Sequence, residues 1–290
     1  MQEITVPACR LCRSPRTQKV YTTEHNGHSY TIIHCLDCHL FQTAEQYDAL
    51  SPDYLAVKAE DIDADRLWCM GLHKQEAFKQ WLCLINSYCG NQARQPMELL
   101  DVGCGTGGFL DFAAEAGFTV SGFDLSSEQA AYAAQRHHQV RCASCINDYL
   151  AGRNKSDKQF DLITLWDVLE HIRNPLTFLA DLRLHLRPGG ILFISVPNGG
   201  AIGWKKIMLK MIGKKADFAP WEHVFYYTPN ALRKYLTQSG FTVRECSTVK
   251  AYFRAPSKFE WLRRAGFRML SHLPSIAPQI FATATVVHHE

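Results

Sequence analysis

Residues 97–109 read Met97-Glu-Leu-Leu-Asp-Val-Gly-Cys-Gly-Thr-Gly-Gly-Phe109, an apolar run that leads into four glycines. Glycines at this density let the backbone turn tightly and approach a ligand closely. Helical patterning follows from Phe109 to Ala116 and stops at Gly117. A strand, a glycine-rich loop and a helix in this order predict the first unit of an α/β sheet.

The alternation of strands and helices continues toward the C-terminus. We expect helices at 126–137 and 176–186. Further strands are predicted at 118–123, 140–146, 160–165, 191–196, 241–248 and 281–287. Strands separated by helices form right-handed βαβ units, so the pattern predicts a mainly parallel sheet.

Two acidic residues characterise the ligand that the glycine loop would hold. The loop reads G-x-G-x-G and not G-x-G-x-x-G, and Asp101 directly precedes it. A carboxylate there would repel a pyrophosphate but suits a cationic amino-acid group. Asp124 ends the second strand, where a carboxylate can bind both hydroxyls of a ribose. A nucleoside with a charged aliphatic arm and no phosphate fits this pattern, and S-adenosylmethionine (SAM) is such a molecule.

Three segments resemble the class I SAM-dependent methyltransferases. They are 98–109, 160–175 (Phe-Asp-Leu-Ile-Thr-Leu-Trp-Asp-Val-Leu-Glu-His-Ile-Arg-Asn-Pro) and 186–198 (Leu-Arg-Pro-Gly-Gly-Ile-Leu-Phe-Ile-Ser-Val-Pro-Asn). The resemblance implies a Rossmann-like, seven-stranded α/β methyltransferase sheet over 96–290. It is close over roughly 96–200 and loose beyond.

The resemblance also implies which residues bind the cofactor. Asp101 and the loop glycines would hold the methionine end, Asp124 the ribose, and residues 147–148 the adenine. Residues 166–167, after the fourth strand, would line the cleft near the methyl group. The predicted cofactor-binding residues are Asp101, Gly103, Cys104, Gly105, Asp124, Leu125, Asn147, Asp148, Trp166 and Asp167.

Four of the 11 cysteines form two C-x2-C pairs near the N-terminus. The pairs are Cys9/Cys12 and Cys35/Cys38, and each can present two thiolates to one metal. Lys19-Val-Tyr-Thr-Thr and Tyr30-Thr-Ile-Ile-His read as strands joined by an Asn26-Gly27 turn. We therefore predict a zinc ribbon over 1–45 with a closed, structural Zn²⁺ site, since four thiolates leave no open coordination position. Residues 46–95 have helical patterning and are predicted to form a connector or cap.

Two histidines are candidates for the general base of methyl transfer. His171 follows Glu170 just after the fourth strand, on the ligand side of such a sheet. His223 lies in Trp221-Glu-His-Val-Phe-Tyr-Tyr-Thr-Pro229, which resembles the Glu-His-aromatic segment of sugar C-methyltransferases that carry an N-terminal four-cysteine zinc ribbon. That resemblance implies that His223 is the base and that Glu222 orients it or the substrate. Ubiquinone-type O-methyltransferases share the fourth-strand Glu-His pair, so a phenol or quinone acceptor is the alternative to a sugar.

Composition and charge restrict the remaining readings. No stretch approaches the ~18 apolar residues of a membrane span, and the first seven residues lack the pattern of a secretory signal, so we expect a cytoplasmic protein. Residues 199–290 carry 14 Lys and Arg against 5 Asp and Glu. The segments 200–219 and 259–273 are basic and amphipathic, which suits either a lid over the substrate (200–225) or contact with a membrane surface.

Other function classes fit the sequence less well. A zinc ribbon with a basic C-terminal third could bind RNA, with or without methylating it. The ribbon is not strongly basic, however, and the fourth strand is not followed by the Asn/Asp-Pro-Pro-Tyr tetrapeptide of nucleic-acid amino-methyltransferases. The intact glycine loop and its two acids also disfavour a non-catalytic scaffold. We therefore predict methyl transfer to an oxygen or carbon of a small molecule.

Overall fold

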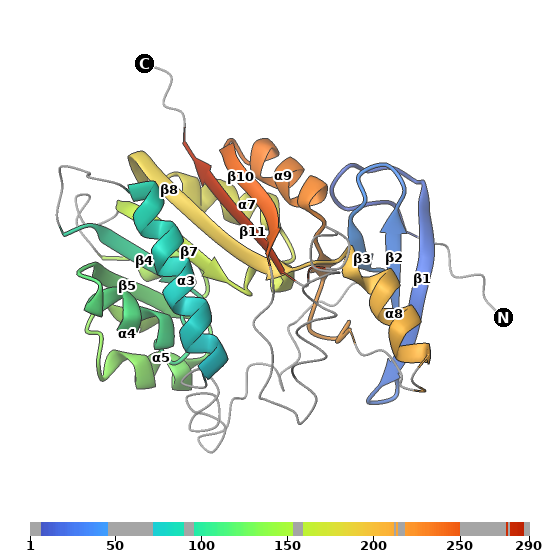
Figure 1. Cartoon of the computed structure of the whole chain (residues 1–290), viewed down its shortest axis with the longest axis horizontal. Coiled ribbons are helices and arrows are strands. Elements are labelled where there is room, and N and C mark those ends of the chain that lie inside the picture. Colours follow the sequence, from blue (N-terminus) through green and yellow to red (C-terminus); the bar gives the residue numbers. More distant parts are fainter. Residues whose placement is uncertain are drawn as a thin grey trace.

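The larger sheet is Rossmann-like and gives the molecule its α/β architecture (Figure 1). The computed structural model describes residues 7–45, 72–89, 96–152, 159–211, 213, 218–249, 277 and 279–286. Over these residues seven strands pair in the order β10-β11-β8-β7-β4-β5-β6. Their bounds are β4 (Glu98–Val102), β5 (Thr119–Asp124), β6 (Val140–Cys142), β7 (Phe160–Trp166), β8 (Leu186–Pro197), β10 (Thr242–Val249) and β11 (Gln279–Thr285).

Strand direction follows from how the strands are connected. Strands β4 to β8 run parallel because a helical crossover separates each from the next. Strand β11 lies antiparallel to β8, and β10 lies antiparallel to β11. The carboxyl ends of β4, β5 and β7 consequently meet at one edge, where the predicted cofactor residues follow them.

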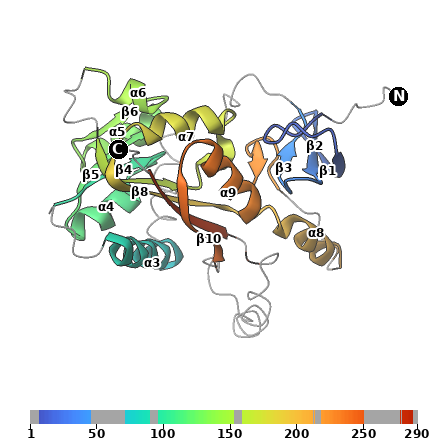
Figure 2. The same ribbon diagram turned by 90° about the horizontal axis from the view of Figure 1, so that it is seen from above.

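Helices cover both faces of this sheet and form two separate apolar cores (Figure 2). On one face lie α3 (Leu72–Cys89), α4 (Gly108–Glu115) and α5 (Ser127–Ala134). On the other lie α6 (Ile146–Tyr149), α7 (Pro175–Arg183) and α9 (Pro229–Gln238). Strand β7 is buried along its whole length because it contributes side chains to both cores.

Two strand predictions are wrong in extent. Strand β6 ends at Cys142 and not at residue 146, because Cys145 caps α6 by accepting a hydrogen bond from the Asp148 N–H. Strand β8 begins at Leu186, so the Pro-Gly-Gly run lies inside the strand and not in the turn before it. Leu186 pairs with Phe160, and the register shifts before Ile191.

The N-terminal segment forms the predicted hairpin and belongs to a second sheet. Strands β1 (Thr17–His25) and β2 (His28–Cys35) pair antiparallel around Asn26 and Gly27, whose φ angles are 49° and 76°. Positive φ at both turn residues is what a two-residue hairpin of this twist requires. The predicted hairpin is therefore confirmed. Strand β3 (Phe41–Thr43), which the sequence did not predict, pairs antiparallel with β2.

The second sheet is completed by a segment from far along the chain. Strand β9 (Phe225–Tyr226) pairs with β3, so the described strands of this sheet follow the order β1-β2-β3-β9. Helix α8 (Ala201–Met211) leaves the end of β8 and lies against the ribbon, where the Lys206 Nζ donates to the carbonyl oxygen of Val20 at 2.9 Å (Figure 1). The short 3-10 helix η2 (Leu169–His171) packs beside β9.

Some sequence predictions fall outside the described residues. Of the predicted connector (46–95), residues 46–71 and 90–95 lie outside the described part of the chain. The whole second basic segment, 259–273, also lies outside it. Among the helices that the structure describes, none is long and apolar enough to cross a membrane.

Candidate functional site

The glycine loop between β4 and α4 brings backbone close to the neighbouring loop. Gly103, Gly105 and Gly107 all have positive φ, at 69°, 53° and 83°. A Cβ at Gly103 would lie 2.5 Å from a methyl group of Val168, which follows β7. Glycine is therefore required there both by conformation and by space. The contact also joins the loop after β4 to the loop that carries the Glu-His pair.

Asp124 connects the end of β5 to the glycine loop. Its Oδ2 accepts a 2.8 Å hydrogen bond from the Gly105 N–H, and its Oδ1 accepts one of 2.9 Å from the Ser126 N–H. These charge-assisted bonds fix the carboxylate at the carboxyl edge of the sheet. Asp124 is half-buried at this edge.

Asp101 lies deeper, within β4 itself. The residue is buried, and its Oδ1 accepts a 2.7 Å hydrogen bond from the hydroxyl of Thr164 in β7. The hydrogen bond joins adjacent strands directly below the loop. A buried carboxylate needs such partners, because leaving it unpaired would be costly.

The sequence did not predict the residues that hydrogen-bond the glycine loop and the start of α4. The Arg136 Nη2 donates to the carbonyl oxygen of Thr106 at 2.6 Å, and the Arg136 Nε donates to Asp111 Oδ1 at 3.0 Å. The His137 ring contacts the same Asp111 oxygen at 2.7 Å. Asp111 lies in the first turn of α4, so these contacts connect the end of α5 to the start of α4. Nothing in the local sequence pattern of 135–137 indicates this role.

Four further predicted cofactor residues differ in exposure. Cys104 is buried, and burial raises the pKa of its thiol well above the ordinary value. Leu125 is exposed. Asn147 and Asp148 are exposed in α6, and the Asp148 Oδ2 accepts a 2.9 Å hydrogen bond from the Ser144 N–H.

Trp166 and Asp167 lie at the end of β7 but point to different surroundings. The Trp166 ring stacks on Trp81 of α3, with centroids 4.2 Å apart and planes 3° from parallel. Phe109 packs edge-on against the same indole at 5.0 Å. Asp167 has a φ of 57°, and its Oδ1 accepts a 3.2 Å hydrogen bond from Gln279 of β11. Trp166 therefore anchors α3 over the carboxyl edge of the sheet.

The structure brings His171, Glu222 and His223 together from distant parts of the sequence. The rings of His171 and His223 lie edge to face with centroids 4.9 Å apart. The His171 Nδ1 lies 3.1 Å from the carbonyl oxygen of Glu222, and burial lowers the pKa of His171. Glu170 is buried beside them, with a carboxylate oxygen 3.9 Å from the His171 Nε2. The two histidines form one patch beside the loop after β7.

The ribbon holds the segment that carries His223. The hydroxyl of Thr43 in β3 donates to the backbone carbonyl oxygen of His223 at 2.8 Å, and the Thr43 N–H donates to Val224 at 3.0 Å. The His25 ring, at the hairpin tip, stacks on Trp221 with centroids 3.9 Å apart. The ribbon thus positions the Glu-His-aromatic block directly, which neither sequence motif predicted.

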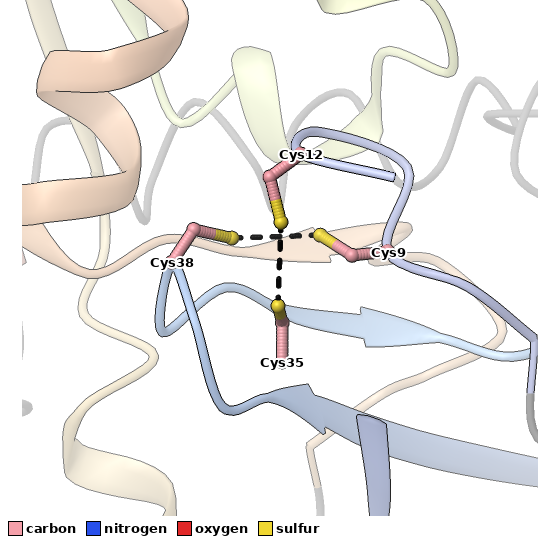
Figure 3. A group of neighbouring side chains, drawn as sticks. All are labelled: Cys9, Cys12, Cys35 and Cys38. Atoms are coloured by element: carbon pink, nitrogen blue, oxygen red, sulfur yellow. Dashed lines mark hydrogen bonds between the residues drawn. The ribbon is translucent and has the colours of Figure 1, made fainter. Parts of the chain in front are cut away.

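The four cysteines converge between the two ribbon knuckles (Figure 3). Their sulfur atoms lie within 4.8 Å of one another, with Cys9–Cys38 at 3.4 Å and Cys12–Cys35 at 3.5 Å. A tetrahedron with metal–sulfur bonds of about 2.3 Å has sulfur–sulfur edges of about 3.8 Å. The hydrogen bond from Cys38 lowers the pKa of Cys9 to about 5, which favours a thiolate. The spacing and chemistry of this cluster fit one Zn²⁺ ion.

Comparison with known proteins supplies the family. The family model described as a methyltransferase domain matches residues 73–246, more than half of the chain. The chain belongs to this methyltransferase family. The glycine loop, the Asp124 carboxylate and the histidine patch all lie inside the matched region, and the protein is a SAM-dependent methyltransferase.

Two curated relatives of this methyltransferase carry the same name. The ubiquinone biosynthesis O-methyltransferase of Glaesserella parasuis is 29% identical over 182 residues, which cover 58% of this chain and 73% of the relative. The enzyme of that name from Actinobacillus pleuropneumoniae is 33% identical over 123 residues, which cover 40% and 51% of the two chains. The similarity therefore spans one half to three quarters of these relatives.

Solved structures agree on the fold of the methyltransferase. A phosphoethanolamine N-methyltransferase 2 from Haemonchus contortus in complex with SAM gives a TM-score of 0.55 at 17% identity and covers 93% of this chain and 71% of its own. A complex of the Haloferax volcanii Trm112 methyltransferase activator with a methyltransferase gives 0.52 at 15% identity, with 78% and 96% covered. At these identities the similarity shows the class I fold alone.

Proposed function

We propose that this methyltransferase transfers the SAM methyl group to a hydroxyl oxygen of a small molecule, with His223 as the general base. The pairing of His171 with His223 beside the loop after β7 carries the proposal. The O-methyltransferase names of the relatives support oxygen as the acceptor atom, and their quinone chemistry supports a phenolic hydroxyl.

The cofactor residues fit SAM by geometry and by chemistry. Positive φ at the three loop glycines lets the backbone approach a ligand, and the fixed Asp124 carboxylate can accept hydrogen bonds from ribose hydroxyls. Asp101 lies in the strand below and adds negative charge that favours a cationic amino-acid group. Bound SAM supplies an electrophilic methyl group on a sulfonium.

The protein must then align the acceptor and remove its proton. Alignment of two reactants can supply about 7–11 kcal/mol of the barrier. His223 would accept the hydroxyl proton as the methyl group is transferred, which leaves an imidazolium. The lowered pKa of His171 keeps that ring neutral at physiological pH, so it adds no repulsion to the protonated partner. The carbonyl of Glu222, in contact with His171, fixes the orientation of the patch.

Labelled SAM and a panel of catechols test the proposal. We expect His223→Ala to lower kcat by about 10²- to 10⁴-fold because a positioned base contributes that much. The dissociation constant for SAM should change less than twofold. His138→Ala, an exposed histidine remote from the patch, is the matched control. Full turnover in His223→Ala would remove the base assignment, and methylated carbon in the product would remove the oxygen assignment.

We also propose that Cys9, Cys12, Cys35 and Cys38 bind one structural Zn²⁺. The convergence of four sulfur atoms supports a closed site, and such sites hold small ribbons that lack a core of their own. Metal analysis of purified protein should find one zinc per chain. Cys35→Ser should abolish stoichiometric zinc, whereas Cys142→Ser, an exposed cysteine of β6, should retain it.

A further inference from the structure

A cavity of about 570 Å³ lies where the ribbon meets the methyltransferase sheet. Its walls come from the first cysteine knuckle, from the end of the ribbon, from the start of α7 and from α9. The described residues that line it include Arg10, Arg13, Glu45, Arg173, Val224 and Phe225. Neither His171 nor His223 is among them, so the cavity is distinct from the proposed catalytic patch.

Three arginines converge on this cavity from two parts of the fold. Arg10 and Arg13 come from the knuckle, and Arg173 comes from the loop before α7. Glu45 is the one acidic residue among the described lining residues, so their formal charge is +2. Burial lowers the pKa of Arg10, and the Arg173 charge lowers it further, so the guanidinium groups repel one another.

The described residues leave part of the hydrogen-bonding capacity of these arginines unused. The Arg10 Nη2 donates to the backbone carbonyl of Glu45 at 3.0 Å, and its guanidinium lies over the Phe225 ring at 5.8 Å. Arg10 is therefore held in place with donors to spare. Within the described part of the chain, the Arg13 and Arg173 side chains have no hydrogen bond or ion pair with another residue.

The N-terminus of α7 adds partial positive charge to that of the three arginines. Helix α7 has nine residues, with Pro175 in its first turn and no side-chain cap at Asn174. Residues 174–177 line the cavity, so this helix N-terminus lies at the cavity wall without a side-chain cap. Helix N-termini favour anions. Guanidinium groups match the geometry of phosphate oxygens through paired hydrogen bonds. A phosphate monoester carries a charge of about −1.5 to −2 at neutral pH, which would balance the lining.

We propose that this cavity binds the phosphate group of a phosphorylated small molecule, held by Arg10, Arg13 and Arg173. The ligand would bridge the ribbon and the methyltransferase sheet. Since Val224 lines the cavity and directly follows His223, the bound phosphate would stabilise the segment that carries the catalytic patch. The proposal does not depend on which acceptor atom is methylated, because the test measures phosphate binding and not methyl transfer.

Calorimetric titration of the zinc-loaded full chain tests the site. Inorganic phosphate and a nucleoside diphosphate serve as probes at constant ionic strength, with chloride as the reference anion. We expect saturable binding of both probes and a loss of about tenfold or more in Arg173→Gln, because one charge-assisted hydrogen-bond pair is removed. Arg233→Gln removes the same charge from the exposed face of α9, outside the cavity, and should bind as the wild type does.

The outcomes separate a built site from two simpler explanations. Equal weakening by Arg173→Gln and Arg233→Gln would mean general attraction of anions to a basic surface and would overturn the proposal. Unchanged phosphate binding in Arg173→Gln, together with zinc loss in Arg13→Gln, would assign the knuckle arginines to balancing the thiolates and would also overturn it. Competition between inorganic phosphate and an acceptor in the methyl-transfer assay would place a phosphate on the acceptor itself. Binding without such competition would identify a separate phosphorylated ligand.

Discussion

Asp124 shows how one side chain serves both the fold and the proposed cofactor site. It accepts hydrogen bonds from the Gly105 and Ser126 N–H groups. In the proposed cofactor site it would also accept hydrogen bonds from ribose hydroxyls. We expect Asp124→Ala to raise the dissociation constant for SAM by about tenfold or more, since hydrogen bonds to a charged group contribute about 1.5–3 kcal/mol each. Isothermal titration calorimetry measures this directly. Glu115→Ala, an exposed carboxylate at the end of α4, is the control, and equal SAM affinity in both variants would remove Asp124 from the site.

His171 makes the stability of the fold depend on pH. Burial lowers its pKa in the folded state below the ordinary value of 6.5, so the unfolded chain binds the proton more readily. Stability linked to this group is therefore present above pH 6.5 and is lost as pH falls through the folded-state pKa. Urea unfolding at a series of pH values measures the free energy of unfolding. As the pH falls below 6.5, this free energy should decrease less in His171→Gln than in the wild type. His138→Gln should leave the loss unchanged, and parallel curves for all three proteins would contradict the assignment.

At the scale of elements, local patterns predicted most of the fold and contacts distant in sequence account for the rest. The Asn26-Gly27 turn and the alternating strands beside it determine the hairpin from local sequence. The glycine loop and α4 are likewise determined by local sequence. Strand β9 has only two residues, and its partner β3 lies about 180 residues earlier, so no window of sequence could reveal it. The Arg136–Thr106 and Thr43–His223 contacts were missed for the same reason.

The β3–β9 pairing should transmit changes in the ribbon to catalysis. Thr43→Val keeps the shape of the side chain but removes the hydrogen bond to the His223 carbonyl oxygen. We expect kcat to fall several-fold, because small displacements of a catalytic group are costly, while SAM affinity and zinc content stay constant. Thr43→Ser retains the hydroxyl and should retain more activity than Thr43→Val. A smaller loss in Thr43→Val than in Thr43→Ser would show that the methyl group of Thr43 matters and the hydrogen bond does not.

At the scale of the whole molecule, the two sheets depend on one another unequally. One apolar core of the seven-stranded sheet, beneath α3, α4 and α5, includes no described residue of the ribbon. The other core also contains Cys9, Cys35 and Cys38, so the ribbon shares it with the sheet. Much of the rest of the ribbon is exposed. A structural zinc site contributes about 10–16 kcal/mol of apparent binding free energy, far more than so small a core. Loss of metal should therefore unfold the ribbon first and leave the cofactor half of the larger sheet folded.

Zinc removal then separates cofactor binding from turnover. A chelator that strips the metal should abolish methyl transfer, because unfolding of β3 releases the His223 segment from Thr43 and from the His25 stack. SAM should still bind with unchanged affinity, since the glycine loop and Asp124 belong to the other sheet. Calorimetry with SAM and a parallel activity assay on the same chelated sample measure both quantities, and re-addition of Zn²⁺ should restore turnover. Full activity in metal-free protein would mean that β9 keeps its position without the ribbon, whereas simultaneous loss of SAM binding would mean that the two sheets unfold as one unit.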